Sequence, residues 1–84
     1  MAGVAVLAAT VRGGKRFAED LAISGAVVVT PATVDRMRGL SLSAVIESSE
    51  FENLSATQRN RVRETVAPCL YTTGGPWFAA SEIR

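Results

Sequence analysis

Three short apolar runs separated by glycine-containing turns fill the first thirty residues, and this pattern constrains the fold more than any other feature. Residues 4–11 and 26–30 are rich in valine, and residues 17–23 alternate between apolar and polar side chains. Gly13-Gly14 and Ser24-Gly25 separate the runs, and such dipeptides can close tight hairpins. The sequence therefore predicts an antiparallel β-meander.

The same region has a second interpretation. Phe17 and Leu21 are four residues apart, as are Ala18 and Ala22, which is the spacing of side chains on one face of a helix. Residues 15–24 would then form a helix that connects two parallel strands with a very short crossover. We prefer the meander because of its turn dipeptides and keep the βαβ unit as the alternative.

Helical signals begin after the third run. Thr30-Pro31 is typical of a helix start, because the hydroxyl can cap free N–H groups and proline suits the first helical position. This short helix would end at Gly39. A second helix would begin after Ser41 and end at Asn53.

A capping box marks a third helix. Ser55 stands three residues before Gln58, so each side chain can reach a free backbone N–H of the other residue. Pro68 stops this helix, residues 69–72 have strand composition, residues 73–76 form a turn, and Trp77 begins an extended segment. The predicted fold class is α+β in one domain, residues 1–84. It comprises a small antiparallel β-meander, two or three short helices and a C-terminal strand or hairpin.

Composition excludes several classes of site. The 84 residues include no histidine and one cysteine, and the formal net charge is +1. These counts exclude Ser-His-Asp and Cys-His catalysis, histidine-ligated zinc and an intramolecular disulfide. We expect no cofactor and no metal. The longest apolar run, residues 2–9, is far shorter than the ~20 residues of a membrane-spanning helix, so we expect a soluble protein, intracellular or assembled into a particle, without a membrane partner.

Residues 9–16, Ala-Thr-Val-Arg-Gly-Gly-Lys-Arg, approach the phosphate-binding pattern [A/G]-x4-G-K-[S/T]. In that pattern the glycine N–H groups and the lysine hold phosphate, and the final hydroxyl holds Mg²⁺. Arg16 occupies the position of the hydroxyl, so the metal ligand is missing. We interpret the segment as the charged tip of a hairpin.

Residues 34–46 resemble the helix-turn-helix of bacterial and phage regulators. The resemblance rests on Gly39 in the turn, Leu40 after it, Ser41 as a cap and Val45 where the second helix would pack. It implies a small DNA-binding regulator that uses residues 31–50. Since residues 41–54 carry three glutamates and no cation, a charge that opposes phosphate, nucleic acid is the second choice of partner.

Three arginines, Arg59, Arg61 and Arg63, cluster on the predicted third helix. Arginine pairs with carboxylate or phosphate in a bidentate geometry. Three interpretations stay open: pairing with the acidic segment of the same chain, contact with another chain, or contact with phosphate.

Catalytic residues are not evident. Glu47, Glu50 and Glu52 are close in sequence, but nothing in the sequence indicates the pocket that an acid/base pair needs. Cys69 has no histidine to activate it. We therefore predict a protein that is not an enzyme.

Apolar surface is the remaining signal. A small domain cannot bury both faces of the run that contains Val4 and Val6, and Trp77 and Phe78 would point to opposite faces of a strand. We predict a structural or protein-interaction subunit of a larger assembly, such as a virus particle. These four residues, with the three arginines, would bind a protein partner or further copies of the chain.

Overall fold

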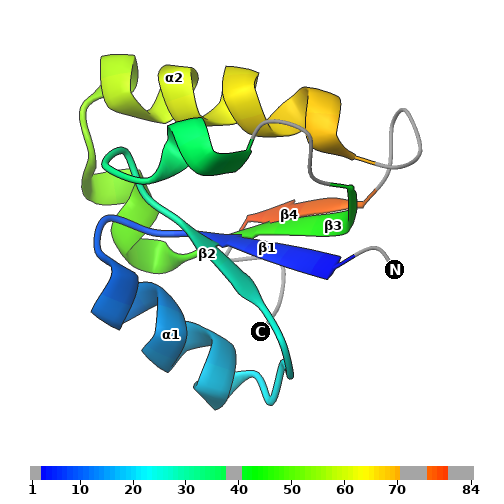
Figure 1. Ribbon diagram of the computed structural model, residues 1–84. Helices are drawn as coiled ribbons and strands as arrows, with labels where there is room; N and C mark the ends of the chain where they lie inside the picture. The colour runs from blue at the N-terminus through cyan, green and yellow to red at the C-terminus, as the bar shows by residue number, and fades with distance from the viewer. Residues whose placement is uncertain (1–2, 38–40, 71–75, 80–84) are drawn as a thin grey trace.

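The computed structural model describes residues 3–37, 41–70 and 76–79, and four strands in it form one parallel sheet (Figure 1). The strands are β1 (Gly3–Leu7), β2 (Val27–Val29), β3 (Leu42–Glu47) and β4 (Trp77–Ala79). Their order across the sheet is β2-β1-β3-β4, and all three neighbouring pairs are parallel. The predicted antiparallel meander is therefore wrong.

The first connection explains the error. Gly13 and Gly14 lie inside helix α1 (Val11–Asp20), which links the parallel strands β1 and β2. The βαβ alternative therefore has the correct topology, although the helix begins and ends four residues earlier than the predicted 15–24. Both positions are crowded, although the atoms close to Gly13 belong to the end of a flexible side chain. A Cβ atom on Gly13 would meet the carboxylate of Glu50, and one on Gly14 would meet the side chain of Val28.

Both ends of α1 have defined caps. Thr10 accepts a hydrogen bond from the Gly13 N–H through its hydroxyl at 3.0 Å. At the other end, the Ile23 N–H donates to the Ala18 carbonyl and the Ala22 N–H donates to the Glu19 carbonyl. This is the Schellman arrangement, in which the residue after the C-cap adopts left-handed backbone angles and is usually glycine. Here that residue is Ala22, with φ of 56°.

Ala22→Gly is expected to raise the free energy of unfolding by about 0.5–1 kcal/mol. Left-handed geometry costs a residue with a Cβ about 1–2 kcal/mol, and the extra freedom of glycine in the unfolded chain offsets part of the gain. Urea unfolding measures the change. The control Ala18→Gly lies in the buried interior of α1 and should destabilise the protein. Destabilisation by Ala22→Gly would contradict the expectation.

Predicted helices in residues 31–53 are also corrected. The structure has a 3-10 turn η1 (Val34–Met37), then strand β3, then a 3-10 turn η2 (Ser49–Asn53). Since β3 lies inside a parallel sheet, it is apolar on both faces, and its apolar residues imitate helical spacing. A strand stands where the recognition helix was expected, so the predicted helix-turn-helix over residues 31–50 is wrong. Its turn residues Gly39 and Leu40, and with them the predicted helix end at Gly39, lie outside the described residues.

The predicted N-cap at Ser55 is confirmed. It opens helix α2 (Ala56–Val66), and the Gln58 N–H donates to the Ser55 hydroxyl at 3.2 Å. The Gln58 side chain, however, lies 3.4 Å from the Ser55 hydroxyl and not on the Ser55 backbone N–H, where the capping box requires it. A 3-10 turn η3 (Ala67–Cys69) follows α2, and β4 forms the predicted extended segment at Trp77. The predicted strand over 69–72 and turn over 73–76 fall largely on 71–75, outside the described residues.

Two layers cover the sheet. Figure 1 shows α1 on one side of the strands, and η1 with α2 on the other. The main core lies between the sheet and the η1–α2 layer and includes Leu7, Val29, Val45, Phe51, Val62 and Val66, all fully buried. On the opposite side, α1 makes its main contacts with β1 and β2, so it covers the β2–β1 half of the sheet.

Candidate functional site

The carboxyl ends of β1 and β3 lie side by side at the centre of the sheet. The chain leaves β1 toward β2 on one side and returns to add β3 on the other, so the direction of strand addition reverses there. Ligands of open parallel sheets bind at such a reversal, often with an anionic group at the following helix N-terminus. A ligand site is therefore expected at this edge.

Glu50 already occupies that position. Its Oε1 atom accepts hydrogen bonds from the Ala9 and Thr10 N–H groups at 3.0 Å each, just before α1 begins. The Thr10 hydroxyl lies 3.4 Å from the same oxygen. A carboxylate of the chain thus sits where the phosphate-loop pattern would place phosphate.

The phosphate-loop pattern consequently has no cradle. Its Gly13 and Lys15 lie within α1 instead of in a loop ahead of it, and Glu50 fills the space beside Gly13. The residues that approach the pattern serve helix packing and helix capping. The predicted hairpin tip is also absent, because the segment is helical.

A second carboxylate, Glu47, lies buried at the end of β3. Arg63 from α2 donates to it from Nε at 2.8 Å and from Nη2 at 2.9 Å, and the Trp77 indole N–H from β4 donates at 2.8 Å. The Arg63 guanidinium also lies 5.5 Å from the centre of the Phe51 ring, within the range of a cation–π contact. We call Glu47, Phe51, Arg63 and Trp77 the Glu47 cluster.

Opposing effects set the pKa of Glu47. Burial alone would raise the pKa of this carboxyl group, but the hydrogen bonds from Arg63 and Trp77 and the arginine charge together hold it below the ordinary value of 4.5. Glu47 is therefore ionised near neutral pH. The three hydrogen bonds to Glu47 join β3 to α2 and β4. Because its oxygens are already engaged by these donors, Glu47 is not arranged as one member of an acid/base pair.

The other two arginines of α2 also find partners within the chain. Arg61 pairs with Asp35 of η1 at 3.2 Å on an exposed surface. Arg59 donates to the Glu52 backbone carbonyl at 2.6 Å. Among the three interpretations of the arginines, contact within the same chain agrees with these pairs. Only Arg63 binds the side chain of a glutamate from the acidic segment.

Four apolar residues were proposed as contacts, and the structure separates them. Val6 is fully buried in β1 and therefore has no surface to offer a partner. Trp77 is half-buried, and its indole N–H binds Glu47 within the Glu47 cluster. Val4 is half-buried, and the side chain of Phe78 is 40% exposed. Strand parity places Val4 and Phe78 on the α1 side of the sheet, opposite Trp77.

Those two residues belong to a larger surface that the sequence analysis did not predict. The register sets Val4 beside Ala44, and Ile46 beside Phe78. Ala44 and Ile46 are half-buried. We call Val4, Ala44, Ile46 and Phe78 the open face. The open face could have been predicted only if residues 42–47 had been assigned to a strand.

Neither Cys69 nor a metal site among the described residues provides a further candidate site. Cys69 is buried, and its thiol donates to the Met37 carbonyl at 3.1 Å. The described residues include no group of three acidic, cysteine or histidine side chains placed to bind a metal ion. Within the same ranges, none of the helices has the length and apolar character to cross a membrane.

Comparison with known proteins does not change this picture. No family model matches the sequence, and no curated protein or solved structure matches it. A proposal of function therefore rests on the geometry of the chain alone.

Proposed function

We propose that the chain is a non-enzymatic protein-interaction subunit that associates with further copies of itself through the open face. The open face is the observation that supports this proposal. Parallel sheets are normally covered on both faces, yet α1 packs mainly on β1 and β2, and Phe78 of β4 remains 40% exposed. A second protein layer would cover the part of this face that the described residues leave exposed.

A second copy fits this surface by its charge and symmetry. The four residues of the open face are apolar, so these side chains bring no like charges together when two copies meet. A twofold dimer brings the same patch together from both chains and therefore needs no separate complementary surface. Such a contact would also allow the chain to serve within a larger assembly.

Phe78→Ser is expected to weaken self-association about tenfold. Only the exposed part of Phe78 is left to be buried, which contributes about 0.8 kcal/mol per copy, and a twofold interface contains it twice. Sedimentation velocity across micromolar to millimolar protein concentrations measures the change. Because Phe78 lies outside the main core, the variant should remain folded.

Val11→Ser is the matched control. Val11 is also 40% exposed, but it lies on α1, so its replacement should leave association unchanged. Equal weakening by both variants would indicate general stickiness of apolar surface. A wild-type chain that stays monomeric at millimolar concentration would also contradict the proposal.

A further inference from the structure

A groove of about 300 Å³ lies between α1, β2 and η1, away from the open face. Six of the side chains that line it come in pairs from these three elements: Val11 and Lys15, Val27 and Val28, and Arg36 and Met37. Four of the six are apolar and two are cationic. The volume is at the lower end of the range for small-molecule sites.

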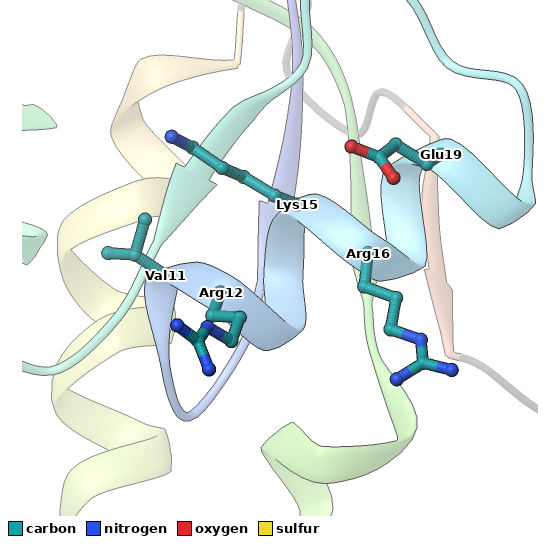
Figure 2. Close-up of a pocket in the computed structure, with 5 residues that line it drawn as sticks. All are labelled: Val11, Arg12, Lys15, Arg16 and Glu19. Atoms are coloured by element: carbon teal, nitrogen blue, oxygen red, sulfur yellow. The ribbon is translucent and has the colours of Figure 1, made fainter.

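A larger hollow beside the groove, about 520 Å³, is less suitable as a site. Figure 2 shows the side chains that line it, and all five come from α1. A single helix cannot enclose a ligand, so this hollow is open space between side chains. The groove shares Val11 and Lys15 with the hollow but has walls on three elements.

The two cations at the groove are not neutralised within the described residues. Lys15 and Arg36 are exposed, and neither forms an ion pair there. The nearest acidic neighbour of Arg36 in sequence, Asp35, pairs with Arg61 of α2. None of the residues that line the groove is acidic, so the groove combines an apolar floor with positive charge from two walls.

We infer that this groove binds a small organic anion with an apolar body, such as an alkyl carboxylate. The apolar side chains would contact the body, and Lys15 and Arg36 would approach the carboxylate from α1 and η1. A nucleic acid fits less well, because no aromatic side chain lines the groove to stack a base. Arg12 and Arg16 do not line the groove. Figure 2 shows them pointing away from the side of α1 on which Val11 and Lys15 lie.

Titration with octanoate, followed by two-dimensional ¹H–¹⁵N NMR, tests the inference. We expect saturable, millimolar binding, with the largest shifts at amides of Val11, Lys15, Val28 and Met37. Affinity should rise up to about fourfold for each CH₂ group from butyrate to octanoate, because each added group buries apolar area. Shifts spread over the whole surface, or affinity independent of chain length, would overturn the inference.

Charge variants test the role of the two cations. Lys15→Gln and Arg36→Gln should each weaken octanoate binding about three- to fivefold, as expected for partly exposed ion pairs. Arg12→Gln removes the same charge from α1 outside the groove and should change affinity less than about twofold. Equal weakening by Arg12→Gln would mean that net charge alone attracts the anion and would overturn the site. Phe78→Ser leaves the groove intact, so failure here and failure of the proposed self-association are distinguishable.

Discussion

Replacement of Arg63 by methionine is expected to lower the free energy of unfolding by about 2–3 kcal/mol. Loss of one partner from a buried ion pair costs about 3–5 kcal/mol, because the other charge stays buried without compensation. The Glu47 side chain is only 7% exposed, whereas that of Arg63 is 39% exposed, so water can replace part of the lost contact. Methionine keeps the apolar stem, and urea unfolding at pH 7 measures the change.

Arg61→Met provides the matched control on the same helix. Arg61 and Asp35 are also paired, at 3.2 Å, but their side chains are 60% and 66% exposed. Surface pairs contribute little after solvent screening, so this variant should change stability by no more than about 0.5 kcal/mol. Equal effects of the two variants would show that the buried pair of Arg63 and Glu47 stabilises the fold no more than the exposed pair of Arg61 and Asp35.

The pH dependence of stability tests the same cluster independently. The pKa of Glu47 is lowered in the folded chain, so its stabilising contribution is fully present above the ordinary value of 4.5 and is lost as pH falls through the lowered value. Without Arg63, burial of the carboxyl group opposes ionisation with less compensation. The difference in stability between wild type and Arg63→Met should therefore shrink below pH 4.5. A difference that stays constant down to pH 3 would contradict this account.

The two adjacent glycines show why the first half of the fold was mispredicted. Gly13-Gly14 is typical of a turn because glycine adopts positive φ at no steric cost. In α1 both residues have helical geometry. Gly14 lacks room for a Cβ atom because Val28 and Ala8 approach it closely, whereas the atoms close to Gly13 are the end of the flexible Glu50 side chain. Val28 and Glu50 are distant in sequence from the glycines, so local turn chemistry could not predict their approach.

Strand β3 shows a different limit of sequence interpretation. Leu42, Val45 and Ile46 have the i, i+3, i+4 spacing of a helix face, yet the segment is a strand between β1 and β4. In a six-residue element that is apolar on both faces, the periods of helix and strand cannot be told apart. The N-cap at Ser55 was predicted correctly because its hydrogen bond to the Gln58 N–H is local.

Only part of the candidate surfaces could be predicted. Pairing of the arginine-rich helix with the preceding acidic segment was among the alternatives, and Arg63 does pair with Glu47. Two further contacts could not be predicted: Trp77 binds Glu47, and Glu50 binds the start of α1. Both depend on the order of the strands in the sheet. The open face likewise requires Ile46 and Phe78 to be neighbours, which follows from the parallel register and not from spacing.

Gly14→Ala is expected to lower the free energy of unfolding by about 1 kcal/mol. In an exposed helix this change would stabilise by about 1 kcal/mol, because alanine has the higher helix propensity. Here the new Cβ would overlap the Val28 side chain and lie 3.1 Å from the Ala8 Cβ. Overpacking of this kind typically costs 1–3 kcal/mol, and Val28 has little rotamer freedom to move aside, being β-branched. Thermal and urea unfolding measure the net change.

A double-mutant cycle with Val28→Ala identifies the cause. If the overlap with Val28 is the reason for the loss, truncation of Val28 makes room for the added methyl group. The two substitutions together should then cost at least about 1 kcal/mol less than the sum of the single changes, since residues in direct contact are not additive. Additive costs would show that Gly14 is required for another reason, and stabilisation by Gly14→Ala alone would show that α1 does not pack against β2 as closely as the structure has it.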